Sequence, residues 1–197
     1  MKTIIAAAAV ALVLGTAGQA RAQEWFWGAT YSTVMPLGNT KDFNSSFSWR
    51  GATIEGRKMI KENLSAGLSF GWHVLADQYD NKTVEFPIGA ITGTFFNYTN
   101  SFPILANVHY YLGQPGGVRP FIGANVGTSI VERRSEVGLF ALTESNWTFA
   151  AAPEAGLAFP VGWHVAGLIS ARWHFMTAAG SAPSQQYVTF NVGFASK

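Results

Sequence analysis

The sequence contains no cysteine and few charged residues. None of its 197 residues is Cys, which excludes a disulfide framework, a thiolate metal site and a cysteine nucleophile. Only 12% of the residues are Asp, Glu, Lys or Arg, against about 25% in ordinary soluble domains. Yet 48% of the residues are hydrophobic. We therefore expect much of the surface to face something other than water.

The chain beyond residue 22 also lacks a long hydrophobic run. A membrane-spanning helix needs about 20 consecutive apolar residues, and no such segment is present there. The other structure that can cross a bilayer is a closed β-barrel, because lipid cannot satisfy the unpaired edges of an open sheet. The composition therefore favours a transmembrane barrel.

The first 22 residues have the pattern of a secretory signal peptide. Lys2 supplies the positive start, residues 4–14 form an apolar core, and Ala20-Arg21-Ala22 is a small-x-small cleavage motif. A core of this length is too short for a transmembrane anchor. We predict that residues 1–22 are a cleaved signal peptide and that the mature chain, residues 23–197, begins at Gln23.

Loss of the signal peptide removes the basic excess. The full chain has 13 basic and 11 acidic residues, a net charge of +2. Lys2 and Arg21 leave with the signal, so the mature chain has 11 basic and 11 acidic residues and a net charge of zero. No basic cluster with interleaved aromatics is present either, so we expect no nucleic-acid binding.

The mature chain shows the period-two pattern of β-strands. In residues 187–194, Val188, Phe190, Val192 and Phe194 alternate with polar or small residues. The same alternation recurs in residues 25–32, 52–57, 64–73, 106–111, 122–127, 147–159 and 165–175. We predict an all-β fold: one eight-stranded, antiparallel, up-and-down transmembrane β-barrel over residues 23–197.

The connections between these runs alternate in length. Short links rich in Gly, Pro and Asn fall at residues 61–63, 114–117 and 160–162. We predict longer loops at residues 37–47, 77–98, 134–143 and 177–184. Short periplasmic turns and long outer loops are typical of outer-membrane barrels. The apolar stretch 86–96 either extends the strands above the membrane or folds into the barrel mouth.

Alternation alone does not say which face points outward, so a soluble lipocalin-like barrel is a rival. A soluble barrel normally carries many charges on its polar face, whereas this polar face is mostly Gly, Ser, Thr and Asn. Such a face suits a narrow lumen. Trp25, Trp27 and Tyr110 also fall where an interfacial aromatic girdle belongs.

The charges inside the predicted strands all lie on the polar face. An Arg facing lipid at the bilayer midplane would cost about 2–4 kcal/mol, whereas opposite charges in a narrow lumen can pair. The interior of an eight-stranded barrel is just wide enough for side chains to fill it. We therefore predict a polar and ionic network that plugs the lumen: Glu55, Arg57, Asn107, His109, Asn125, Glu154, Arg172 and His174.

Two segments carry a family resemblance. Residues 104–112, ILANVHYYL, are followed by a Gly-rich turn and by residues 119–127, RPFIGANVG. This arrangement resembles the OmpA/OmpX-like and opacity-type small barrels of the outer-membrane β-barrel domain family. The resemblance implies a place in the bacterial outer membrane, among its lipids and lipopolysaccharide. It also implies insertion by the barrel-assembly machinery and contact with a surface partner through the outer loops.

A catalytic site is not expected. His73 and His174 lie near the predicted outer strand ends, with Ser170 and Thr177 nearby in sequence. A lipid deacylase needs a hydroxyl nucleophile, a base and an orienting acid. A lipid A deacylase would carry a His-x-Ser-Asn stretch, but residues 174–177 read His-Phe-Met-Thr. Both histidines are better explained as hydrogen-bonding lumen residues.

A metal or cofactor site is not expected either. His109 and His164 are predicted at the periplasmic side and the other two histidines at the outer side, so four of them cannot converge on one tetrahedral ion. We predict a non-enzymatic barrel with a structural, envelope-integrity or surface-interaction role. A small-solute, porin-like channel is the main alternative, and a lipid A-modifying enzyme is the second.

Overall fold

The structure, a computed structural model, describes residues 25–86, 89–137, 140–180 and 182–196. They form one closed antiparallel barrel in the strand order β1 to β8. The strands are β1 (Trp25–Leu37), β2 (Arg50–Lys61), β3 (Leu64–Phe86), β4 (Gly89–Tyr111), β5 (Arg119–Val137), β6 (Phe140–Pro160), β7 (Val165–Met176) and β8 (Gln185–Ser196). The predicted eight-stranded up-and-down barrel is confirmed. The predicted signal peptide and the start at Gln23 lie outside the described residues.

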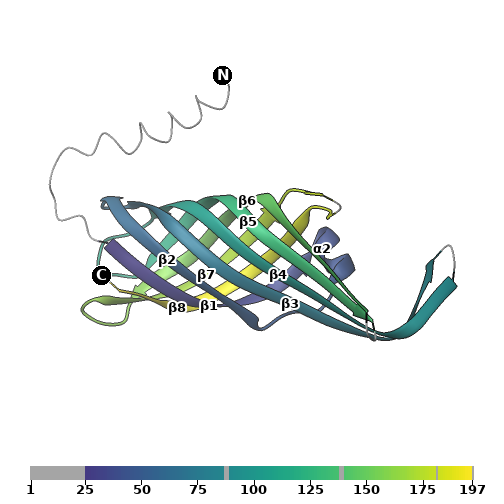
Figure 1. Cartoon of the computed structure of the whole chain (residues 1–197). Coiled ribbons are helices and arrows are strands. Elements are labelled where there is room, and N and C mark those ends of the chain that lie inside the picture. Colours follow the sequence, from purple (N-terminus) through teal and green to yellow (C-terminus); the bar gives the residue numbers. More distant parts are fainter. Residues whose placement is uncertain (1–24, 87–88, 138–139, 181, 197) are drawn as a thin grey trace, which may run out of the picture.

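The barrel closes where its first and last strands meet. β1 pairs with β8 from Trp27↔Ser196 to Leu37↔Gln186, and every other strand pairs with its neighbours in sequence. Where all eight strands are paired, the wall of the barrel therefore has no open edge. Figure 1 shows tilted strands wound around one axis, with the C-terminal end of β8 and the short turns together at one end.

Three short connections define that end. Residues 62–63 join β2 to β3, residues 112–118 join β4 to β5, and residues 161–164 join β6 to β7. In the second of them Gly113 and Gly116 have φ angles of 83° and 87°, a left-handed conformation that glycine adopts without steric cost. Short turns face the periplasm in outer-membrane barrels. We call this the periplasmic end and the opposite one the outer end.

Two of the predicted outer loops are wrong, because the chain continues there as strand. β3 and β4 remain paired across residues 77–98, up to Phe86↔Gly89. β5 and β6 remain paired across residues 134–143, up to Val137↔Phe140. Strand pairing satisfies the backbone N–H and C=O groups of these segments. Of the two alternatives open for residues 86–96, the extended strand is the one observed.

The long strands make one side of the barrel taller than the other. β3 to β6 contain 19 to 23 residues each, whereas β1, β2, β7 and β8 contain 12 or 13. In Figure 1 the β3–β4 hairpin projects well past the outer ends of the short strands. We call the projecting residues 75–86, 89–99, 132–137 and 140–145 the outer wall.

The other two predicted loops lie at the outer mouth. Residues 38–49 begin with the short helix α2 (Gly38–Phe43). Thr40 Oγ1 donates a hydrogen bond to Gln185 Oε1 at 3.0 Å, and Asn44 Nδ2 donates to the Asn97 carbonyl at 3.0 Å. These bonds hold the segment between β8 and β4. Among the described residues, no helix has the length and apolar character to cross a membrane.

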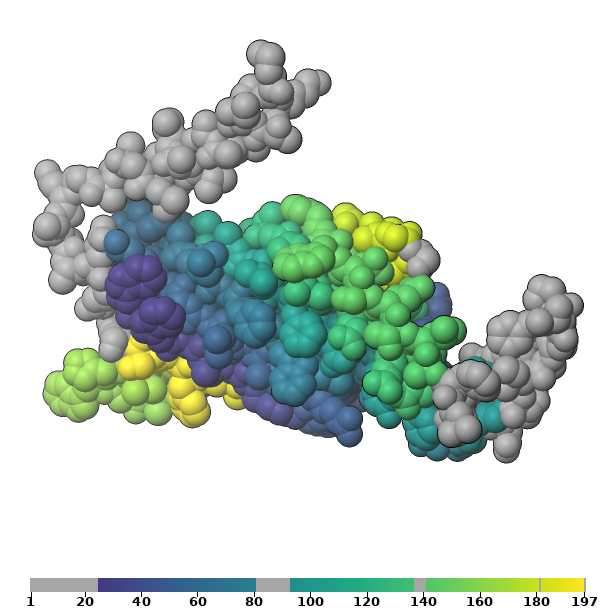
Figure 2. Space-filling view, in the orientation of Figure 1, coloured from purple at the N-terminus to yellow at the C-terminus, as the bar shows by residue number. Residues whose placement is uncertain are grey.

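The two faces of the barrel wall alternate as the sequence pattern predicts. Along β8, Phe190, Val192 and Phe194 are exposed, whereas Thr189 and Asn191 are buried in the lumen. Exposed apolar side chains continue around the outside of all eight strands. Figure 2 shows one side of the barrel, on which the side chains of neighbouring strands pack into a closed surface. A soluble barrel would place its apolar face inside, so the lipocalin-like alternative is excluded.

Candidate functional site

Four charged side chains form a buried layer across the lumen, which we call the ionic layer. Arg57 Nη2 donates to Glu55 Oε2 at 2.7 Å, and Arg172 Nη2 donates to Glu154 Oε2 at 2.7 Å. The two pairs are linked, because Arg172 Nη2 lies 3.5 Å from Glu55 Oε2 and Arg57 Nη2 lies 4.0 Å from Glu154 Oε1. No side chain of the four is more than 5% exposed. Two positive and two negative charges thus neutralise each other inside the barrel.

Neighbouring residues complete the hydrogen bonds of Glu154. His109 Nε2 lies 3.0 Å from Glu154 Oε2, and Asn125 Nδ2 donates to the same oxygen at 3.3 Å. Gly123, on β5, makes room for the His109 ring, because a Cβ there would lie 2.3 Å from His109 Cδ2. A glycine at this strand position is therefore required by space.

Six of the eight predicted lumen residues lie in the ionic layer or contact it directly: Glu55, Arg57, Glu154 and Arg172 form the layer, and His109 and Asn125 contact Glu154. Asn107 is buried beside it, but its amide has no hydrogen-bond partner in the part of the chain that the structure describes. His174 lies farther toward the outer end, where its ring stacks on Tyr187 with a centroid distance of 4.7 Å. The sequence analysis missed Tyr111, whose hydroxyl accepts a hydrogen bond from Arg57 Nη1 at 2.8 Å.

A second buried layer, the histidine–tyrosine layer, consists of His73, His174, Tyr187 and Ser101. His73 Nδ1 lies 3.0 Å from the Tyr187 hydroxyl, which lies 2.9 Å from Ser101 Oγ. The two histidine rings are 5.0 Å apart. Apolar side chains surround this layer: Val34, Leu75, Leu105, Val131, Ala150, Ala152 and Met176. Side chains therefore fill the outer half of the lumen as well.

The chemistry available in these layers is hydrogen bonding and charge pairing. His174 Nε2 lies 3.4 Å from Thr189 Oγ1, and His174 Nδ1 has no partner among the described residues. His164 lies in the turn between β6 and β7, at the periplasmic end. Within the described residues, no three potential metal ligands come together.

The exterior surface of the barrel carries aromatic residues near both of its ends. The predicted girdle residues Trp25, Trp27 and Tyr110 point outward at the periplasmic end, and the rings of Trp25 and Trp27 stack with centroids 6.0 Å apart. The sequence analysis missed a second set of exposed aromatics nearer the outer end: Tyr31, Trp72, Trp147 and Trp173. Two aromatic belts that border an apolar band are the mark of a bilayer-spanning barrel.

Solved structures share this architecture. Neisserial surface protein A matches with a TM-score of 0.58 at 13% identity, over 90% of this chain and 99% of that one. The outer-membrane protein OprG from Pseudomonas aeruginosa matches with a TM-score of 0.58 at 11% identity, over 89% of this chain and 96% of that one. A major outer-membrane protein from Thermus thermophilus gives 0.53 at 12% identity, with coverage of 88% and 99%.

The fold is that of a small bacterial outer-membrane β-barrel. The predicted resemblance is confirmed at the level of fold, and the predicted outer-membrane localisation agrees with these neighbours. No protein-family model and no curated protein matches the sequence.

At its outer mouth, this outer-membrane barrel anchors a loop to Asp77. The residue lies beyond Trp72 of the outer belt and hence outside the membrane band. Its carboxylate accepts hydrogen bonds from the Ser45 amide, from the Ser46 amide at 3.2 Å and from the Tyr79 hydroxyl at 3.0 Å. Partial burial acts to raise the pKa of Asp77, but these hydrogen bonds outweigh it and lower the pKa. The loop thus has a charged attachment point on β3.

Proposed function

We propose that this outer-membrane barrel is a non-enzymatic protein with a structural or surface-interaction role and a closed lumen. The observation that carries the proposal is the ionic layer, in which Glu55, Arg57, Glu154 and Arg172 bridge the interior at 2.7 to 4.0 Å. Lipids and lipopolysaccharide of the outer membrane are its immediate surroundings.

Three levels of buried side chains support a closed lumen. Nearest the periplasmic end, Phe121 and Leu168 pack with Ala195. The ionic layer follows, and the histidine–tyrosine layer with its apolar neighbours lies beyond it. A solute would have to separate buried ion pairs and displace packed apolar groups, and both steps cost several kcal/mol.

The outer wall supports the surface-interaction part of the proposal. It carries backbone and side chains beyond the membrane band, and Leu142 on β6 is 77% exposed. Connecting segments that rise above a rigid scaffold are where binding residues concentrate. We propose that a surface partner contacts this wall and that the barrel-assembly machinery inserts the chain.

Conductance of the refolded protein in a planar bilayer tests the closed lumen. We expect no large, stable current steps. A variant with Glu55→Ser and Arg57→Ser keeps the net charge and removes one of the two ion pairs of the ionic layer, and we expect it to stay closed because the Glu154–Arg172 pair and the histidine–tyrosine layer remain. Adding Glu154→Ser, Arg172→Ser, Phe121→Ala and Tyr187→Ala should produce steps, because all three levels are then opened. Large, stable steps from the unaltered protein would contradict the proposal and favour the small-solute, porin-like alternative.

The non-enzymatic part has a separate test. The hydroxyl within hydrogen-bonding distance of His174 among the described residues is that of Thr189, which is fully buried in the lumen and so out of reach of a lipid in the surrounding bilayer. We expect no release of acyl chains when the refolded barrel is incubated with lipopolysaccharide. Release of acyl chains by the unaltered barrel that disappears in the His174→Ala variant would contradict the non-enzymatic role and favour a lipid A-modifying enzyme.

A further inference from the structure

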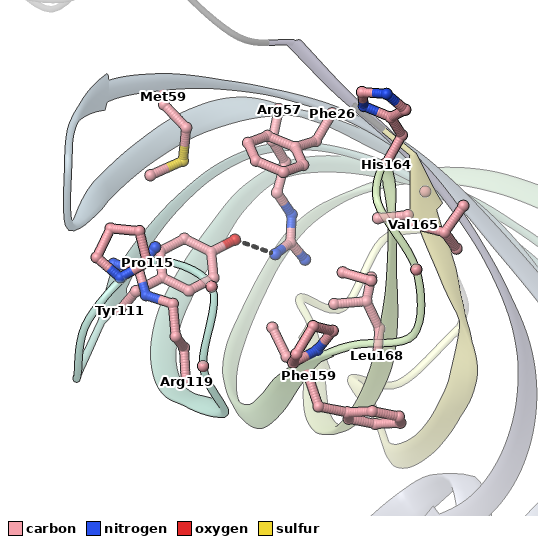
Figure 3. Close-up of a pocket in the computed structure, with 18 of the residues that line it drawn as sticks. Phe26, Arg57, Met59, Tyr111, Pro115, Arg119, Phe159, His164, Val165 and Leu168 are labelled. Carbon is pink, nitrogen blue, oxygen red and sulfur yellow. Dashed lines mark hydrogen bonds between the residues drawn. The ribbon is translucent and has the colours of Figure 1, made fainter.

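A cavity of about 170 Å³ opens at the periplasmic end, below the packed residues Phe121 and Leu168. Strands β1, β2, β4 to β8 and two of the short turns line it. Figure 3 shows Arg57 reaching toward Tyr111 on one side of the cavity and Arg119 at its margin. The ionic layer closes the lumen behind it, so the cavity is a blind pocket and not the entrance to a pore.

The charge of the lining is positive. Arg57, Arg119 and Glu55 line the cavity, and Glu55 is already paired with Arg57 at 2.7 Å. Arg119 has no carboxylate partner within salt-bridge distance in the described parts of the chain, and its one hydrogen bond goes from Nη2 to the Glu62 carbonyl at 2.8 Å. Its guanidinium lies over the Tyr111 ring, 5.0 Å from the centroid.

The two arginines keep unused donor capacity. A guanidinium has five N–H donors. Nε of Arg57 and Nε of Arg119 are both buried without a hydrogen-bond partner among the described residues. A buried donor without an acceptor is costly, and a carboxylate is an acceptor whose two oxygens match the geometry of a guanidinium. The polar part of the cavity therefore fits an anionic head group.

The rest of the lining is apolar and partly aromatic. Phe26, Met59 and Leu168 face the cavity together with the Tyr111 ring. An apolar cavity of about 150 Å³ is large enough to hold one benzene ring. The volume observed here fits one aromatic ring with a short chain that carries the head group to the arginines.

We propose that this cavity binds small monocarboxylates with an aromatic or similarly compact apolar body, taken up from the periplasm. The ring lies among the apolar side chains, and the carboxylate accepts hydrogen bonds from Arg119 and, on its inner side, from Arg57. The ligand does not have to pass through the ionic layer to bind. The proposal therefore does not depend on whether the barrel conducts.

Methyl NMR of the refolded protein in lipid nanodiscs tests the proposal, because the mature chain offers built-in reporters. Met59 lines the cavity, whereas Met176 lies in the apolar part of the outer half of the lumen. Titration with hydrocinnamate should shift the Met59 methyl signal in a saturable way and leave Met176 unchanged. Hydrocinnamyl alcohol and phenylpropylamine, which lack the carboxylate, should bind at least about tenfold more weakly, the loss expected for one charge-assisted hydrogen bond.

Variants locate the site. Arg119→Gln should weaken hydrocinnamate binding at least about tenfold, Arg119→Lys should weaken it less, and Ala166→Trp should abolish it by filling the cavity. Arg134→Gln, which removes an arginine from the outer wall, should bind like the unaltered protein. Heat-modifiable gel migration checks that each variant folds. Absence of a saturable Met59 shift, equal affinity for the alcohol, or unchanged binding by Arg119→Gln would each overturn the proposal.

Discussion

Arg172 lies directly opposite Glu154 in the register of β6 and β7, and its guanidinium donates two hydrogen bonds to one carboxylate oxygen, at 2.7 and 3.0 Å. Adjacent strands thus place a cation and an anion side by side in the lumen. The pair is joined to a second one, Arg57 with Glu55, which lies on the opposite wall. These four side chains, whose charges neutralise each other, connect opposite sides of the barrel wall across the lumen.

Removal of one of these charges should destabilise the barrel strongly. Glu154→Gln leaves Arg172 and Arg57 buried with too little negative charge, and breaking a buried pair from one side typically costs about 3–5 kcal/mol. Urea unfolding in lipid vesicles, followed by tryptophan fluorescence, measures the loss. Glu136→Gln is the matched control, because Glu136 pairs with a half-exposed Arg134 on the outer wall and such a pair contributes about 0–1 kcal/mol. Equal losses for the two variants would contradict the stabilising role of the ionic layer.

The sequence was sufficient to predict which face each charge occupies. Side chains alternate along a strand with a period of two, so the parity of Glu55, Arg57, Glu154 and Arg172 relative to their apolar neighbours placed all four inside. Which of them pair could not be predicted. That depends on the register between strands and on the curvature of the barrel, which bring Arg172 within 3.5 Å of Glu55 although 117 residues separate them.

The ends of the strands were harder to predict than their faces. The sequence analysis predicts a loop at residues 77–98, although a hairpin above the membrane has water on both sides and needs no apolar face. The alternation that marks a strand in the lipid is therefore absent there. The position of Asn44 was also inaccessible from sequence, because its hydrogen bonds to Asn97 and Thr99 join distant segments.

Gly193 should control closure of the barrel. It lies at the β1–β8 seam, where a Cβ would be 2.1 Å from the Ala29 carbonyl oxygen and 2.6 Å from Thr30 Cα. Backbone atoms cannot move aside without parting the strands, so we expect Gly193→Ala to destabilise the barrel by at least about 1–3 kcal/mol. Unboiled samples of this variant should lose the altered gel migration of the folded barrel at lower temperature than the unaltered protein.

A glycine outside the seam supplies the control. Gly162 lies in a periplasmic turn, and a Cβ there would meet no atom within 4 Å. Gly162→Ala should keep the melting temperature of the unaltered protein. If both variants melt alike, close packing at the β1–β8 seam does not limit stability.

Asp77 should make the loop of residues 44–49 sensitive to acid. Its pKa is lowered in the folded protein, because hydrogen bonds to the carboxylate outweigh its partial burial. Because the pKa is lowered, the hydrogen bonds to the ionised carboxylate stabilise the loop fully at pH values above the ordinary aspartate pKa. This stabilisation is lost as the pH falls through the lowered pKa. NMR titration of the Ser45 and Ser46 amides should therefore show a midpoint below the usual aspartate range, and Asp77→Asn should abolish that titration. A midpoint at or above the usual range would contradict the charged anchor.

The orientation of the wall is tested most directly at Phe190, because every other conclusion about the lumen depends on it. Phe190 is 43% exposed on the outer face of β8, between Val188, which pairs with Trp173 of the outer belt, and Phe194 near the periplasmic end. Phe190→Arg places an unpaired charge in hydrocarbon, and we expect a loss of about 2–4 kcal/mol in the free energy of unfolding from lipid vesicles.

Leu142→Arg makes a comparable change at a site that is 77% exposed on the outer wall, where water can solvate the charge. Its loss should stay within about 0.5 kcal/mol, as for most surface substitutions. The difference between the two variants isolates the contribution of lipid, because both replace a large apolar side chain by arginine on an exposed strand position. Similar losses at the two sites would mean that Phe190 does not face the bilayer and that the assignment of inner and outer faces is wrong.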